Sequence, residues 1–443
     1  MLNYFLRRIE RVLKSSPKKQ IMYSFGLKGV SVLISLLYVP VVLSYLDKEK
    51  FGIWITVTSV INWIRLFDVG IGNGLRHQLG TAIALGKMEK AQELVSTTYF
   101  ILGAIFSSIL LVSLILNPVL NWQLILNTTV VSEKDLLIVT NIALIAIILT
   151  FVFQIVKTIY EAHANTAAGN IMQLISSALT LICVWLLTLF SEPGDLITAV
   201  FIVAGVPLMV YLGANVFTYK LNYGELTPKF SKVRMKGSRE LFRLSGKFFV
   251  VQITAMVLYS SLPFVITQFY GPSAVSEFHV ARSIFNLPVV AIGLFTAPLV
   301  PFVTQAFARK EFKRIQKMLS KSMLLAVFIG IGTMLMVLMA PWIYKIWLGG
   351  LIEISEKLTL AIGIYTVVLV LVNPLSRFLN GTGKINILVW LAPLEIGFFL
   401  IGCFVFDYLI GSVEAIVWGL GFASCLGLFM EPIVLRKLLW HGS

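Results

Sequence analysis

The sequence predicts an all-α integral membrane protein. About twelve transmembrane helices are expected in two pseudo-symmetric six-helix lobes around a central cleft. Three observations support this fold class. The chain is 58% hydrophobic and only 13% charged, whereas soluble domains carry about 25% charged residues. Apolar segments long enough to cross a bilayer recur along the whole chain, and its two halves share sequence features at a constant offset.

A transmembrane helix needs about 20 mostly apolar residues. Segments that meet this condition follow one another from residue 20 to residue 435. We expect helices at residues 20–46, 51–75, 94–118, 136–160, 169–190, 196–219, 248–270, 277–305, 322–345, 357–379, 385–407 and 413–435. The longest polar segment between them, residues 220–247, is too short to fold alone.

The N-terminal segment is basic, and its apolar residues recur at helical spacing. We expect an amphipathic helix that lies on the cytoplasmic membrane surface. The predicted organisation is an N-terminal segment (1–19), an N-terminal lobe (20–219), a basic cytoplasmic linker (220–247), a C-terminal lobe (248–435) and a cytoplasmic tail (436–443).

The distribution of lysine and arginine predicts the orientation of the chain across the membrane. If the N-terminus is cytoplasmic, 27 of the 36 basic residues fall in cytoplasmic segments and 5 on the opposite side. Such a bias indicates a multi-pass membrane protein with both termini cytoplasmic. The net charge of +15 then reflects topology, so nucleic acid is not expected as a partner.

An internal repeat appears when the chain is shifted by 224 residues. The segment 86–98 then falls on 310–322, and Gln92 coincides with Gln316. Both lobes begin on the cytoplasmic side because six crossings separate them. The sequence therefore predicts a parallel repeat, an architecture typical of transporters.

Signatures of enzyme chemistry are missing from the sequence. Cys183, Cys403 and Cys425 all lie in apolar runs, so neither a disulfide framework nor a metal cluster is expected. The histidines are scattered, and no phosphate-binding loop is present. We therefore predict a protein without catalytic activity, resident metal or cofactor.

Charged residues inside predicted spans are functional candidates, because burying a charge in lipid is costly. Lys28, Arg65 and Arg282 are the basic candidates, although Lys28 and Arg282 can also reach water at the helix ends. Arg65 and Asp68 lie three residues apart and can pair on a helix. The slight basic excess within the spans favours an anionic substrate.

Glu395 lies near mid-span, two residues after Pro393. A carboxylate beside a helix breaker is a candidate for coupling to H⁺ or Na⁺. The alternative is a buried ion pair with a basic residue such as Lys28 or Arg65.

Glycines and prolines interrupt the second helix of each half. Gly70, Gly72 and Gly74 follow Asp68, and Pro298 and Pro301 occupy the equivalent region of the C-terminal lobe. Interrupted helices commonly line transporter cavities, so these residues are candidate hinges. Ordinary helix ends and kinks are the alternative.

Two segments carry a family resemblance. The run from Phe67 to Arg76 resembles the motif after helix two in bacterial polysaccharide repeat-unit flippases of the O-antigen (Wzx) type. The run from Tyr45 to Trp54 resembles the pattern before it. These flippases belong to the multidrug/oligosaccharidyl-lipid/polysaccharide exporter superfamily.

The resemblance implies translocation of undecaprenyl-diphosphate-linked oligosaccharide from the cytoplasmic to the periplasmic leaflet, by ion-coupled alternating access, for surface polysaccharide biosynthesis. It implies that Lys28, Arg65 and Arg282 contact the head group, and that Asp68 and Glu395 act in gating or ion coupling. Membrane lipids and polysaccharide polymerase machinery are the implied partners.

Two other functions stay open. A cation-coupled multidrug antiporter of the same superfamily often has a carboxylate in helix one, where this chain has Lys28. A non-transporting scaffold of a polysaccharide assembly complex needs neither the repeat nor the charges within the spans.

Overall fold

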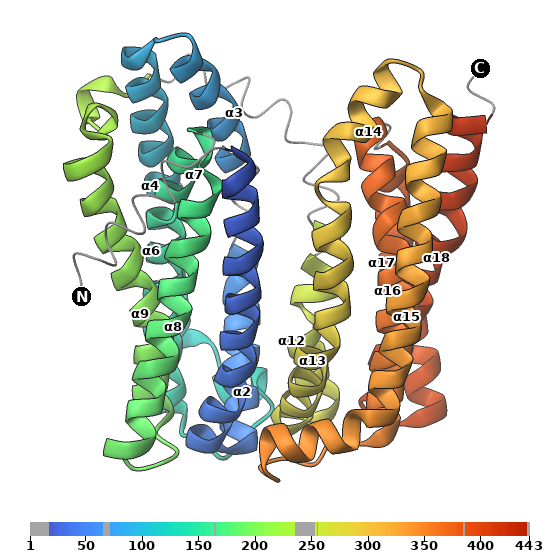
Figure 1. Ribbon diagram of the computed structural model, residues 1–443. Coiled ribbons are helices and arrows are strands. Elements are labelled where there is room, and N and C mark those ends of the chain that lie inside the picture. Colours follow the sequence, from blue (N-terminus) through green and yellow to red (C-terminus); the bar gives the residue numbers. More distant parts are fainter. Residues whose placement is uncertain are drawn as a thin grey trace. The chain divides into compact units, whose positions relative to one another are not determined.

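The computed structural model describes residues 17–64, 71–163, 165–234, 253–254, 256–383 and 386–440, and these residues contain helices but no strand. The chain divides into two compact units, which we name unit 1 (Met1–Phe249) and unit 2 (Val250–Ser443). Figure 1 shows that each unit is a bundle of long helices.

Unit 1 combines long helices with three short ones. Its helices are α2 (Pro17–Ile61), α3 (Ile71–Ala84), α4 (Met88–Leu116), α5 (Trp122–Ile125), α6 (Glu133–Phe153), α7 (Ile155–Ala162), α8 (Thr166–Phe190) and α9 (Leu196–Phe217). Polar side chains cap several of them. Ser132 accepts a hydrogen bond from the amide of Asp135 at the start of α6, and Asp195 caps α9 in the same way. Such caps satisfy amides that have no partner inside the helix.

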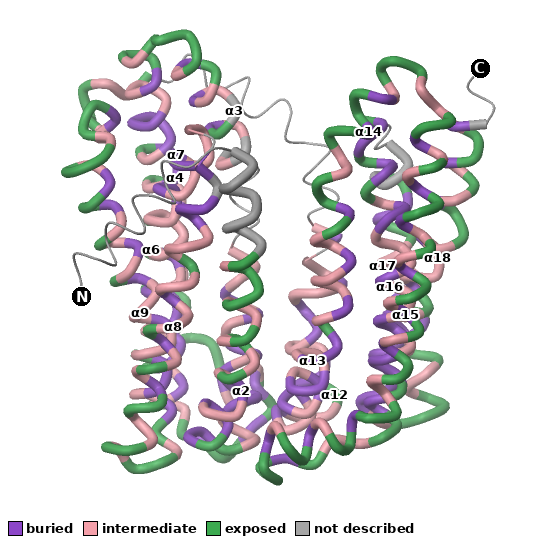
Figure 2. The backbone as a smooth tube through the Cα atoms, in the orientation of Figure 1, coloured by how far each residue is buried: buried purple, intermediate pink, exposed green. Residues whose placement is uncertain are grey.

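Unit 2 also combines long helices with short ones. They are α12 (Leu262–Tyr270), α13 (Pro272–Thr296), α14 (Leu299–Ala308), α15 (Phe312–Leu348), α16 (Glu356–Thr382), α17 (Asn386–Ile410) and α18 (Glu414–Trp440). The central helix is α16. Buried residues make up 56% of its apolar stretch, more than in any other described candidate span (Figure 2).

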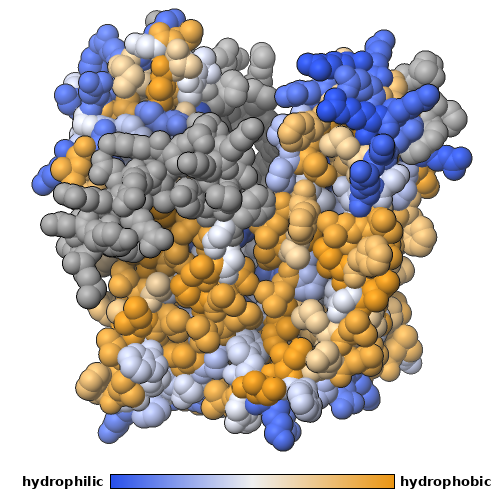
Figure 3. Space-filling model, viewed as in Figure 1, coloured by the Kyte–Doolittle hydropathy of each residue, from blue (hydrophilic) through white to orange (hydrophobic). Residues whose placement is uncertain are grey.

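The predicted fold class is confirmed. Ten helices in the described part of the chain are long and apolar enough to cross a membrane. One of them, α2, continues through a sharp break at Asp47 and so covers the first two predicted spans. The predicted seventh span is represented by a short π-helical turn (Met256–Ser260) and α12. Hydrophobic side chains cover the middle of the face seen in Figure 3, with hydrophilic ones toward its two ends.

Two predicted helix boundaries are wrong. The second span, predicted at 51–75, ends at Ile61, and a separate helix begins at Ile71. The eighth span, predicted at 277–305, ends at Thr296, and Pro298 directly precedes α14. Proline lacks the amide that a continuous helix needs and clashes with the preceding turn. Apolar composition continues through both breaks, so hydropathy alone does not reveal them.

The repeat is visible in the backbone. Asp47 breaks α2 with φ 70° and ψ 173°, and Gly271, 224 positions later, has φ 80° and ψ 170°. This conformation is almost restricted to glycine. Asp47 adopts it while its carboxylate accepts the amides of Glu49 (2.9 Å) and Lys50 (3.0 Å). The same turn is therefore made by glycine in one unit and by a capping aspartate in the other.

A second pair of equivalent contacts involves Gln92 and Gln316. The Gln92 side chain donates to the backbone carbonyl of Thr227 (3.0 Å), which follows the last helix of unit 1. The Gln316 side chain donates to the carbonyl of Leu439 (2.9 Å), near the end of unit 2. In unit 1, α4 thus contacts the segment after α9, and in unit 2 the equivalent helix α15 contacts the last turn of α18.

We predict that Gly271→Ala lowers the free energy of unfolding by about 1–3 kcal/mol, because alanine is strained in this conformation. No atom lies near the added Cβ, so backbone strain is the cause. Gly271→Asp is expected to cost less, since its carboxylate can cap α13 as Asp47 caps its own turn. The check is the thermal stability of the detergent-solubilised protein.

Gly293→Ala is the matched control for this experiment. Gly293 is helical, and a Cβ added to it would also meet open space. Alanine is favoured over glycine within a helix, so this change should not destabilise the protein. Equal stability of Gly271→Ala and Gly293→Ala would contradict the role of the turn.

Candidate functional site

The predicted charged residues are divided between the two units. Lys28 lies on α2 and is exposed. Arg282 on α13 is partly buried, with its guanidinium 5.6 Å from the centre of the Phe278 ring, which is within range of a cation–π interaction. Glu395 on α17 is also partly buried. Arg65 and Asp68 lie outside the described residues, as does Gly70 among the predicted hinges.

The other candidate hinges occupy two short helices. Gly72 and Gly74 lie in the first turn of α3. Pro298 precedes α14, and Pro301 lies in its first turn, where proline is tolerated. Gly74 and Pro298 are 224 positions apart, so the predicted breakers stand at the starts of equivalent helices.

Both short helices are anchored at equivalent points farther along. A Cβ added to Gly80 on α3 would lie 3.4 Å from the carbonyl oxygen of Ala162. At the equivalent position of α14, the Thr304 hydroxyl donates to the carbonyl of Gly381 (2.9 Å). Each short helix therefore closely approaches a backbone carbonyl of its own unit at this position, and in α14 a hydrogen bond forms there.

Unit 2 contains a buried carboxylate that sequence reasoning did not select. Glu431 on α18 is only 3% exposed. Both of its carboxylate oxygens lie within reach of the Ser376 hydroxyl, at 2.7 and 2.9 Å. Among the residues that the structure describes, no basic group forms an ion pair with it. One turn away on α16, Asn373 accepts a hydrogen bond from Thr296 (2.8 Å).

Further polar groups lie inside the helices of unit 2. Tyr365 on α16 is 4% exposed, and its hydroxyl interacts with that of its neighbour Tyr259. Arg282 and Glu395 act electrostatically on both tyrosines. Glu395 also interacts with Glu431. We call this set, with Ser376, the polar cluster of unit 2.

The polar cluster contains one basic and two acidic side chains inside apolar helices. The two carboxylates interact with each other, and a cation or a proton can neutralise such a pair. The sequence identified Arg282 and Glu395 through their position in apolar runs. Glu431 carries the same signal, but its partner Ser376 lies 55 positions away, so the sequence does not reveal the pair.

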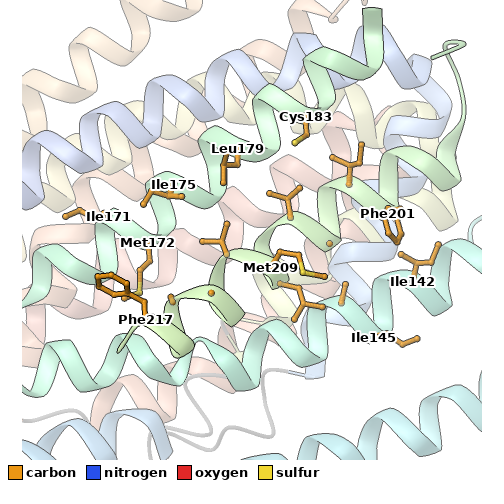
Figure 4. A pocket seen from close by; sticks show the side chains of 18 of the residues that line it. Ile142, Ile145, Ile171, Met172, Ile175, Leu179, Cys183, Phe201, Met209 and Phe217 are labelled. Carbon is orange, nitrogen blue, oxygen red and sulfur yellow. The ribbon is translucent and has the colours of Figure 1, made fainter. Parts of the chain in front are cut away.

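Unit 1 contains an apolar pocket of about 860 Å³ between α6, α8 and α9. Figure 4 shows aliphatic, aromatic and sulfur-containing side chains from these helices around it. The labelled lining residues are Ile142, Ile145, Ile171, Met172, Ile175, Leu179, Cys183, Phe201, Met209 and Phe217. Gly205 and Gly213 on α9 leave room for it, and no atom lies near their Cβ positions. Several lining residues are exposed, so the pocket opens at the side of the bundle.

The pocket is apolar throughout. Tyr160 lines it, but its hydroxyl is bonded within the protein: it lies 3.1 Å from that of Thr218 and accepts a hydrogen bond from the Asn222 side chain (2.9 Å). An apolar space of this kind suits a hydrocarbon chain. The sequence did not predict this pocket, because apolar residues on separate helices give no signal against an apolar background.

The sequence matches a family described as "Polysaccharide biosynthesis protein" over residues 18–307. A second family, MatE, matches residues 248–405. The chain is 20% identical over 381 residues to the "Putative O-antigen export protein" of Yersinia pseudotuberculosis, and the alignment covers 84% of this chain and 85% of that protein.

Solved structures share the fold. An inward-facing multidrug resistance MATE family transporter of the MOP superfamily superposes with a TM-score of 0.78 at 13% identity, over 95% of this chain and all of that one. The lipid II flippase MurJ, in an inward closed conformation, gives a TM-score of 0.71 at 15% identity, over 94% of this chain and 87% of that one.

Proposed function

Because the chain belongs to the polysaccharide biosynthesis protein family, we propose that it translocates undecaprenyl-diphosphate-linked oligosaccharide repeat units across the bacterial inner membrane. Family and fold together indicate a flippase or transporter of the MOP superfamily, not a catalytic enzyme. The proposed direction is from the cytoplasmic to the periplasmic leaflet, with both termini cytoplasmic. The product would pass to polysaccharide polymerase machinery for O-antigen or another surface polysaccharide.

The family match over residues 18–307 is the observation that carries this proposal. The named export function of the Yersinia relative supports the same class of cargo. The apolar pocket of unit 1, which opens at the side of the bundle, also supports the proposal. In this proposal, the polyprenyl chain enters that pocket while the diphosphate stays outside it.

Charged residues take separate roles in the proposal. Lys28, Arg65 and Arg282 contact the diphosphate and sugars, since basic groups attract an anionic head group. Asp68 and Glu395 act in gating or in coupling to H⁺ or Na⁺. The polar cluster of unit 2 supports a coupling role for Glu395 and adds Glu431 to it, because both carboxylates lie inside apolar helices without an ion pair in the described chain.

A cation-coupled multidrug antiporter is the second candidate. The MatE match over residues 248–405 and the similarity to a MATE transporter favour it. Both candidates use alternating access, and they differ in cargo. The cargo experiment below therefore separates them.

Deletion of the gene is expected to abolish the surface polysaccharide and to leave its lipid-linked repeat unit on the inner leaflet. Mass spectrometry of extracted lipids and polysaccharide gels measure both effects, and complementation with the intact gene is the control. Normal polysaccharide in the deletion strain, together with increased sensitivity to drugs, would favour the antiporter instead.

Filling the pocket is expected to block translocation without unfolding the protein. In Gly205→Phe, the new ring enters the pocket, and no atom near the Cβ position prevents it. We expect at least a tenfold loss of surface polysaccharide in complementation at equal protein level. Gly103→Phe on α4 is the control, because Gly103 is also helical and open at its Cβ but does not line the pocket. Full activity of Gly205→Phe would exclude the pocket from the lipid path.

Substitution of the charged residues tests their roles. Lys28→Ala, Arg65→Ala and Arg282→Ala are expected to reduce complementation through lost head-group contacts, whereas exposed Lys345→Ala on α15 serves as the control.

Glu395→Gln and Glu431→Gln are expected to abolish ion-dependent transport while keeping side-chain volume, and Glu353→Gln in an exposed loop is their control. Wild-type activity of all five variants would exclude both the head-group contacts and the role in ion coupling.

A further inference from the structure

The helix α15 extends well beyond the membrane. Its 37 residues span about 55 Å at 1.5 Å per residue, whereas the hydrocarbon core is about 30 Å thick. The excess includes its first three turns, where basic residues concentrate. These turns therefore lie at the level of the lipid headgroups or beyond.

Four basic residues of these turns share one helix face. Lys313, Arg314, Lys317 and Lys321 fall within an arc of about 100°, at 100° per residue, and all four are exposed. On the opposite side, the first turns of α15 pack into a core formed with α14, α16 and α18. We name the three lysines and Arg314 the basic stripe.

The basic stripe is only weakly neutralised. Glu311 is the one acidic residue beside it in the described chain, and it pairs with Arg314 (2.9 Å) and more loosely with Arg309 (3.9 Å). The three lysines of the stripe have no ion pair among the described residues. Their charge is available to an anion outside the protein.

The repeat shows that this charge is not a general feature of the position. Under the 224-residue shift, Lys313, Lys317 and Lys321 correspond to Glu89, Glu93 and Thr97 of α4. In unit 1 the side chains of these three residues bind other groups of the same protein. Glu89 pairs with Lys232 (2.5 Å), Glu93 pairs with Lys90 (3.1 Å), and the Thr97 hydroxyl accepts the amide of Arg234 (2.9 Å).

The same face of α15 identifies the partner. Beyond Lys321 it continues as a row of exposed apolar side chains, from 55% to 78% exposed: Leu324, Phe328, Ile331, Leu335, Leu338 and Trp342. Hydrocarbon chains are the expected neighbours of such a row. Lys321 and Trp342 are about 31 Å apart along the helix, close to the thickness of the hydrocarbon core. Tryptophan is enriched at membrane–water interfaces, so we expect Trp342 at one interface. Lys321 and the rest of the basic stripe then lie at the headgroups of the other leaflet.

We propose that the basic stripe of α15 binds anionic phospholipid headgroups of the leaflet at the N-terminal end of this helix. Clusters of lysine and arginine at the end of a membrane helix attract anionic lipid, with about 1 kcal/mol per residue near the surface. The stripe offers this charge on the face that meets lipid. This inference does not depend on the cargo or on the direction of transport.

The test measures lipid binding beside the stripe in the full-length protein. A fluorophore is attached to Ser320→Cys, an exposed position next to the stripe, after the three native cysteines are replaced. Vesicles contain phosphatidylcholine or phosphatidylglycerol with a nitroxide near the top of the acyl chain, and quenching gives the relative affinity of the two lipids. We expect a preference for phosphatidylglycerol in the otherwise unmodified protein, weakened by high salt.

The combined variant Lys313→Gln, Lys317→Gln and Lys321→Gln is expected to reduce this preference at least about fivefold, the effect of one lysine at an anionic surface. Lysine-to-arginine changes at the three positions should preserve it. Lys87→Gln, Lys220→Gln and Lys229→Gln, all exposed in unit 1, remove the same charge elsewhere and should leave it unchanged.

Three results would overturn the proposal. One is an unchanged preference in the glutamine variant of the stripe. Another is an equal loss in the unit 1 control, which would indicate an effect of net charge alone. The last is the absence of any preference for phosphatidylglycerol in the starting protein. The stripe would then serve to bind a soluble acidic partner or to set the orientation of the helix in the membrane.

Discussion

The whole structure depends on satisfying backbone hydrogen bonds inside lipid. Hydrocarbon offers no partner for a free amide or carbonyl, so the chain must stay helical while it crosses. Breaks are acceptable only where another group supplies the missing bond. Asp47 supplies it with its own carboxylate, which accepts the amides of Glu49 and Lys50. The pattern of breaks, rather than of helices, distinguishes this chain from a simple bundle.

Polar side chains follow the same rule. Glu431 is buried against the hydroxyl of Ser376, and Tyr365 is buried beside Tyr259. Groups of this kind reduce stability unless they gain a partner during function. Their concentration on and around α16, the most buried described span of unit 2, separates the chemistry of unit 2 from the largely apolar pocket of unit 1.

Composition was enough to predict the fold class and most of the spans, because length and hydropathy directly reflect the thickness of the bilayer. It failed at Thr296, where apolar residues continue past the end of α13 and through Pro298 into α14. The site was only partly predictable. Glu395 stood out as an acid in an apolar run, but the bond between Ser376 and Glu431 joins distant positions. The pocket depends on the spacing of Gly205 and Gly213 within a packed bundle, which no local pattern indicates.

The contacts of Gln92 and Gln316 have a consequence for how the protein could be assembled. Each glutamine binds a carbonyl of the segment that ends its own unit. The Thr227 segment and the last turn of α18 therefore receive equivalent contacts. A gene split at the boundary between the two units would leave each glutamine contact within one polypeptide. Such a pair of polypeptides provides a natural starting point for expressing, labelling or exchanging one half of the protein independently of the other.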